Sequence, residues 1–278
     1  VLTSGERPHL LVMSATPIPR SLALTLWGDL DVSTLDERPP GRHPIATRIL
    51  PSEARASVLS EVDAEVAAGG QAYVVMPLVE ESDKIDAVAV EKHVSELRRA
   101  LPLRRVGMVH GRVAAEDRET TMAGFAARRI DVLAATTVIE VGVDVPNASY
   151  LVVENAERFG LAQLHQLRGR VGRGSRPSRA VFLLGEGATE ESRARLEILA
   201  RTEDGFAIAE EDLRRRGPGD ALGTRQSGVP LFRVGDLIRD LAVLRKAREE
   251  AERLEATGGD AAFAERLFFR AGEIPESD

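Results

Sequence analysis

The residues best suited to chemistry form one short segment, residues 166–173, with the sequence QLRGRVGR. Arg170 and Arg173 are three residues apart, a spacing that places two side chains on the same face of a helix. Two guanidinium groups held together suit the equatorial oxygens of a transferring phosphoryl group. The simpler alternative is a solvated basic face, but glycines inside a helical pattern are costly and favour a close contact with a partner. We therefore predict a phosphate-binding role for this segment.

A second segment, residues 135–146 (ATTVIEVGVDVP), follows an apolar run. Hydroxyl and free backbone N–H groups at Thr136 and Thr137 could hold nucleic-acid phosphates. Gly142 permits close approach, and Asp144 could accept a hydrogen bond from a ribose hydroxyl. The alternative is an ordinary strand-to-helix turn capped by threonine. The nearby arginine segment favours the functional interpretation.

These segments resemble motifs of superfamily 2 helicases. Residues 166–173 fit the Q-x-x-G-R-x-G-R motif, and residues 135–146 resemble motif V. Ser14-Ala15-Thr16 resembles motif III. Residues 203–228 (EDGFAIAEEDLRRRGPGDALGTRQSG) resemble the translocation (TRG) motif shared by the RecG family and the transcription-repair coupling factor Mfd. The wording GPGD and GTRQSG favours the RecG family.

The resemblance implies an ATP-driven DNA helicase that remodels branched DNA, such as stalled forks and Holliday junctions, in repair and recombination. Catalytic roles fall to Arg170 and Arg173, which would complete the ATP site together with Gly142, Asp144 and Gln166. DNA-strand contacts are expected at His110, Gly111, Arg112, Thr136 and Thr137. Coupling is expected from Ser14, Ala15, Thr16, Arg214, Arg216, Asp220, Arg225 and Gln226.

Two parts of such a motor are missing from the sequence. A Walker A loop needs a lysine after a glycine, and none of Lys84, Lys92 and Lys246 follows one. The Asp-Glu-x-His tetrad is also absent. ATP and Mg²⁺ are the expected cofactors of a parent protein, with the Mg²⁺ ligands in its first motor domain and no metal site here. That domain and a DNA-splitting wedge domain are the expected partners within the same parent, and we expect negligible ATPase activity from this chain alone.

The scaffold predicted for these segments is an α/β sheet. Strand candidates occur at 46–50, 72–76, 106–109, 130–135, 150–153 and 180–184, and helical patterns at 53–68, 87–100, 115–127, 190–202, 205–216 and 234–257. Alternating strands and helices predict a doubly wound parallel sheet, of RecA-like type by the resemblance. Binding residues are then expected at the carboxyl ends of the strands. Near the N-terminus, 9–13 is predicted as a buried strand, 21–26 as a short helix and 36–42 as a linker.

Three regions follow. Residues 1–43 are expected to be the tail of a first motor domain with its linker, 44–188 a second RecA-like motor domain, and 189–278 a TRG helical hairpin, its loop and C-terminal helices.

The composition sets broad limits. The net charge of −7 argues mildly against nucleic-acid binding, although a local basic patch matters more than the total. The absence of cysteine excludes disulfides and fits a reducing compartment. No apolar run reaches the ~18 residues of a membrane span, and no signal peptide is apparent, so we expect a cytoplasmic protein. Two alternatives stay open: an Mfd-like translocase, and a non-catalytic DNA-binding module.

Overall fold

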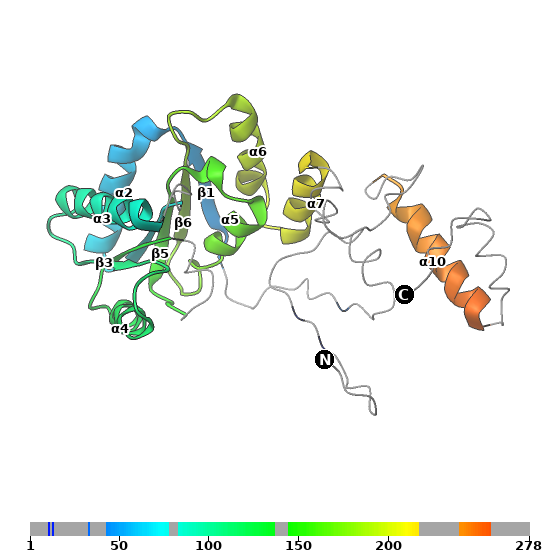
Figure 1. Cartoon of the computed structure of the whole chain (residues 1–278), viewed down its shortest axis with the longest axis horizontal. Helices are drawn as coiled ribbons and strands as arrows, with labels where there is room; N and C mark the ends of the chain where they lie inside the picture. Colours follow the sequence, from blue (N-terminus) through cyan, green and yellow to red (C-terminus); the bar gives the residue numbers. More distant parts are fainter. Residues whose placement is uncertain are drawn as a thin grey trace. The chain divides into compact units, whose positions relative to one another are not determined.

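A computed structural model describes residues 11, 13, 33, 43–77, 83–136, 144–216 and 239–256 (Figure 1); for 83–89, 216, 241 and 255 it describes only the backbone. The described residues fall into two compact units, one holding 43–215 and the other α10 (Leu241–Ala256). Within these described ranges, no helix is long and apolar enough to cross a membrane.

The larger unit is built on a sheet of six parallel strands in the order β1-β6-β5-β2-β4-β3. The predicted doubly wound parallel sheet is therefore confirmed. The strands are β1 (Ile45–Leu50), β2 (Gln71–Val75), β3 (Val106–Val109), β4 (Val132–Ala135), β5 (Ala148–Val153) and β6 (Ser178–Leu183).

Helices cover both faces of the sheet (Figure 1). Because side chains alternate along a strand, Tyr73 and Val75 of β2 enter one core, and Ala72 and Val74 enter the other. The first core is closed by α4 (Ala115–Ala126), α5 (Leu161–Arg168) and α6 (Glu190–Arg201), with α7 (Gly205–Arg216) against it. The second is closed by α2 (Arg55–Ala67) and α3 (Asp83–Ala100). Two short 3₁₀ helices, η1 (Ser52–Ala54) and η3 (Ala156–Arg158), complete the described elements.

All six strands predicted between residues 46 and 184 are present, each within two residues of its predicted ends. Helix α3 begins earlier than predicted, and α10 is shorter than the predicted helix 234–257, of which 234–238 and 257 lie outside the described residues. The buried strand predicted at 9–13 is wrong at both described positions, because Leu11 and Met13 are 79% and 84% exposed and have no regular structure. No described strand pairs with this segment, and a strand needs a partner for its backbone groups. The predicted helix 21–26 and linker 36–42 lie outside the described residues.

Helices α6 and α7 belong to the same compact unit as the sheet, and α6 packs against β1. A region boundary at residue 188 stays a prediction.

Candidate functional site

The expected DNA contacts lie at the carboxyl ends of two neighbouring strands. His110, Gly111 and Arg112 follow β3, and Thr136 follows β4, its parallel neighbour. The Thr136 N–H donates to the Val109 carbonyl at 3.3 Å, so the two strand ends are joined. The structure thus brings four of the five residues together, whereas Thr137 lies outside the described residues.

These four residues differ in exposure. His110 is buried, and its Nδ1 accepts a long, 3.4 Å hydrogen bond from the Arg112 N–H, which holds the turn. Thr136 is fully buried, and within the described part of the chain its Oγ1 has no hydrogen-bond partner. Gly111 and Arg112 are exposed. Of these four residues, only Gly111 and Arg112 are exposed to solvent, and the buried His110 contacts the backbone of Arg112.

The arginine segment does not have the helical form that was predicted for it. Helix α5 ends at Arg168, and Arg170 and Arg173 follow the helix instead of sharing one of its faces. Gly172 adopts φ +77, a conformation that favours glycine because it has no Cβ. The helix ends before both arginines because Gly169 is the C-cap of α5.

Arg173 and Asp144 nevertheless meet. The Arg173 Nη1 lies 3.3 Å from Asp144 Oδ1, and its Nε donates to the Gly169 carbonyl at 3.1 Å. The backbones approach closely here, since a Cβ on Gly174 would lie 2.3 Å from the Pro146 carbonyl oxygen. The Arg173 side chain is 30% exposed and that of Asp144 is 59% exposed. Arg173 is thus oriented by the protein and still accessible to a ligand.

The pKa of Tyr73 on β2 depends on three charged side chains of the candidate site. Burial raises the pKa of Tyr73 to about 12, while Arg170 and Arg173 act to lower it and Asp144 acts to raise it. Three of the residues predicted to bind ATP therefore lie within electrostatic reach of one hydroxyl. Gln166 is half-buried on α5, and Gly142 lies outside the described residues.

Two family models match separate parts of the chain. The model of the helicase conserved C-terminal domain matches residues 54–175, and that of ATP-dependent DNA helicase RecG, domain 3, C-terminal, matches residues 202–269. The chain is 49% identical over 253 residues to the ATP-dependent DNA helicase RecG of Synechocystis, covering 91% of this chain and 30% of the relative. It is also 49% identical over 251 residues to RecG of Escherichia coli K12, covering 90% of this chain and 36% of the relative.

The chain belongs to the RecG family. A solved structure of RecG bound to a three-way DNA junction superposes with a TM-score of 0.69 at 45% identity, covering 88% of this chain and 31% of that one. This match identifies the sheet as RecA-like, as predicted, and the RecG similarity is favoured over Mfd. The chain spans about a third of the length of the RecG relatives cited here.

Arg168 connects the two segments matched by the family models, residues 54–175 and 202–269. The sequence analysis gave this residue no role. Its side chain is 2% exposed. Nη1 donates to the carbonyls of Leu199, at 2.5 Å, and Thr202, at 3.0 Å, and Nη2 lies 2.9 Å from His165 Nδ1. The arginine segment is thereby tied to the end of α6, where the RecG-specific match begins. One sequence signal was present: Arg168 occupies an apolar helical position, four residues after Leu164.

Further contacts hold the start of α7, the helix that begins the predicted TRG hairpin. The Ile45 N–H donates to Glu203 Oε1 at 2.5 Å, and Asp204 Oδ1 accepts from the Phe206 N–H at 2.9 Å, which caps the helix. Farther along α7, Arg214 pairs with Glu211 at 2.7 Å and is exposed. The side chain of Arg216 and all of Ser14, Ala15, Thr16, Asp220, Arg225 and Gln226 lie outside the described residues.

A second buried charge cluster, also missed, lies at the carboxyl end of β5. Glu154 is 4% exposed, receives a hydrogen bond from Arg55 Nε at 2.9 Å and pairs with His93 Nε2. Burial acts to raise the pKa of Glu154, but the hydrogen bond and charge of His93, together with Arg55, outweigh burial and lower it. These contacts tie α2 and α3 to the carboxyl end of β5, which β2 separates from β4 in the sheet.

Proposed function

We propose that this chain is the C-terminal part of an ATP-dependent DNA helicase that remodels branched DNA in repair and recombination. The observation that carries the proposal is the Arg168 clamp, by which we mean its hydrogen bonds to the carbonyls of Leu199 and Thr202. This clamp links the segment of Arg170 and Arg173 to the RecG-specific region that begins at residue 202. A rearrangement of the arginine segment around a nucleotide would thus be transmitted to α7. The similarity to RecG over nine tenths of the chain and the relative bound to a three-way junction support the same function.

In this proposal Arg170 and Arg173 are the catalytic arginines and would stabilise charge on the phosphoryl group being transferred. Asp144, Gln166 and Gly142 would lie at the nucleotide. The exposed Arg173 guanidinium fits a phosphate oxygen. Within the described ranges no group of three side chains could hold a metal ion. We place the Mg²⁺ ligands, which would shield charge on the phosphates, in a first motor domain of the parent.

The remaining assignments complete the proposal. The proposed strand contacts are His110, Gly111, Arg112, Thr136 and Thr137; of the four described residues, Gly111 and Arg112 are exposed and His110 and Thr136 are buried. The parent would be cytoplasmic, with residues 1–43, 44–188 and 189–278 as its three regions here. Coupling would run through Arg214, and through Ser14, Ala15, Thr16, Arg216, Asp220, Arg225 and Gln226.

A chimera tests this function. The first two thirds of the E. coli relative, joined to this chain in place of its own C-terminal third, should unwind a forked DNA in an ATP-dependent manner. The same chimera with Arg173→Ala should bind the fork and hydrolyse ATP at least about a hundredfold more slowly, since such arginines contribute factors of about 10³–10⁵. A folded, fork-binding chimera that cannot unwind would contradict the proposal. Displacement of a stalled RNA polymerase in place of unwinding would favour the Mfd-like alternative.

A further inference from the structure

Positive charge gathers at the amino end of β3 and β4, the edge of the sheet opposite the expected DNA contacts. Six arginines form this amino-edge arginine cluster: Arg98, Arg99, Arg104, Arg105, Arg128 and Arg129. Two carboxylates, Asp63 and Asp131, pair with members of the cluster. Six arginines against two carboxylates leave a net charge of +4, in a chain whose net charge is −7. A helix dipole favours a cation near its last turn by only about 0.3–1 kcal/mol, which does not account for three adjacent pairs.

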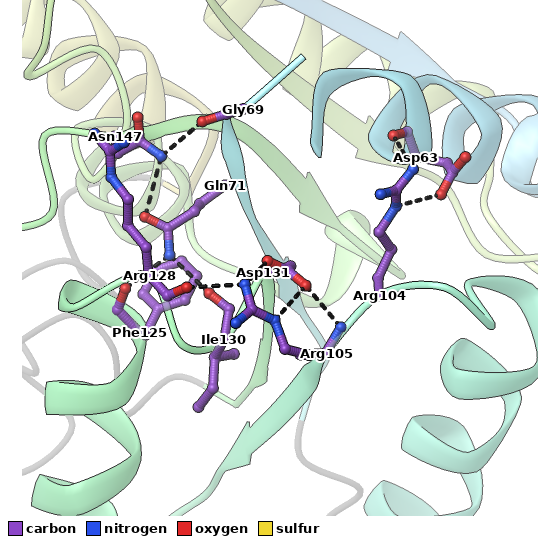
Figure 2. Close-up of polar contacts among 10 residues, drawn as sticks. All are labelled: Asp63, Gly69, Gln71, Arg104, Arg105, Phe125, Arg128, Ile130, Asp131 and Asn147. Carbon is purple, nitrogen blue, oxygen red and sulfur yellow. Dashed lines mark hydrogen bonds and ion pairs between the residues drawn. The ribbon is translucent and has the colours of Figure 1, made fainter. Parts of the chain in front are cut away.

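The cluster stands on a fixed scaffold (Figure 2). Arg105 grips both oxygens of Asp131, with Nε 3.0 Å from Oδ2 and Nη2 2.6 Å from Oδ1, and Nη2 also donates to the Arg128 carbonyl at 2.8 Å. The hydrogen bond from Arg105 is the main cause of a lowered pKa at Asp131, so this carboxylate stays ionised. Arg104 Nε donates to Asp63 Oδ1 at 2.7 Å. The loops before β3 and β4 are therefore locked together.

Three side chains project from this scaffold. Arg99, Arg128 and Arg129 are exposed, and in the part of the chain that the structure describes their guanidinium groups make no ion pair or hydrogen bond. Arg128 also adopts φ +59, a left-handed conformation that costs a residue with a Cβ roughly 1 kcal/mol and favours glycine. An arginine is held here at a conformational cost, and its charge remains available to a ligand.

The cluster is too far from the expected strand contacts to act on the same phosphates. His110 follows Arg105 by five positions along an extended strand, about 17 Å at ~3.3 Å per residue. Guanidinium groups pair with phosphate in a bidentate manner, and the solved RecG relative is bound to a DNA with three arms. We propose that the amino-edge arginine cluster binds the phosphate backbone of a DNA duplex, at a surface separate from the carboxyl edge.

Duplex binding by the 278-residue chain tests this proposal. A fluorescently labelled ~20-base-pair duplex would be titrated without ATP between 50 and 200 mM salt, the range over which phosphate contacts show most clearly. Arg128→Gly with Arg129→Gln should weaken binding about tenfold at the lowest salt. It should also reduce the slope of log K against log salt by roughly 1.8, at ~0.9 per lost contact. Glycine suits φ +59, so this variant should unfold at a temperature no lower than that of the parent chain.

The matched control removes two exposed arginines from α6, by Arg193→Gln with Arg201→Gln. It makes the same change in net charge and should leave the slope unchanged. Equal losses in both double variants, or no duplex binding at 50 mM salt, would overturn the proposal.

An acidic peptide is the alternative ligand, and a substitution at Leu103 distinguishes peptide binding from DNA binding. This side chain is 82% exposed within the cluster, and a peptide with an apolar residue would bury it. Leu103→Ser should leave duplex affinity unchanged, and poly-glutamate should compete less well than DNA per unit charge. Stronger competition by poly-glutamate than by DNA would indicate an acidic peptide as the ligand and would overturn the assignment. Because the measurement uses no ATP, its failure leaves the chimera test of helicase function unaffected.

Discussion

Arg168 and Arg173 belong to the same eight-residue segment but lie in opposite surroundings. Arg168 is buried and directs its guanidinium at backbone carbonyls of Leu199 and Thr202. Arg173 is 30% exposed and is oriented by one carboxylate and one carbonyl. A buried guanidinium must have its donors satisfied by the protein, whereas an exposed one keeps donors for a ligand. One motif thus holds a buried structural arginine and an exposed, predicted binding arginine five residues apart.

Removing the clamp should have the largest effect on stability. Arg168→Ala removes the donor to the buried Leu199 carbonyl and the partly buried Thr202 carbonyl and leaves a cavity, so we expect a loss of about 3–4 kcal/mol in the free energy of unfolding. Urea unfolding of the chain measures it. Arg168→Lys, which keeps one charged donor, should lose less. A change under about 1 kcal/mol would show that the clamp contributes little.

The buried carboxylate of Glu154 should rank second. Glu154→Gln removes the charge facing His93 and Arg55, and we expect a loss of about 3 kcal/mol at pH 7, as for a broken buried ion pair. Because the folded pKa of Glu154 is lowered, its contribution is present above the unfolded value of 4.5 and is lost as the pH falls through the folded value. Unfolding measured from pH 7 to pH 3 should therefore show the two proteins converging at acid pH. Parallel curves would contradict this role.

Arg173→Ala should have the smallest effect on stability. Its pair with Asp144 is partly exposed and 3.3 Å long, and such pairs contribute about 0–1 kcal/mol. Thermal unfolding of this variant should nearly coincide with that of the parent chain. A loss as large as that of Arg168→Ala would remove the distinction between clamp and binding group, and would favour a structural role for both arginines.

Most strands were predictable because they are short apolar runs that end at polar residues, as the fully buried Val132–Ala135 does before Thr136. The pairing of β1 with β6 could not be predicted, because Ile45 and Ser178 lie far apart along the chain. No local sequence pattern specifies the register between the two strands. The end of α5 at Arg168 was also missed, because the three-residue spacing of Arg170 and Arg173 suggested one helix face, whereas Gly169 is the C-cap of the helix.

Residue types and their resemblance to helicase motifs were enough to name Arg170, Arg173 and Asp144 as candidates, whose roles stay predictions. The meeting of Arg173 with Asp144, the clamp of Arg168 on α6, and the convergence of Arg55, His93 and Glu154 depended on the tertiary structure. The physical reason is that chemistry resides in side chains, which a sequence lists, whereas burial and partnership arise only when distant elements pack. The sequence thus determined which groups could act, and the fold decided which of them are buried as supports and which remain exposed to a ligand.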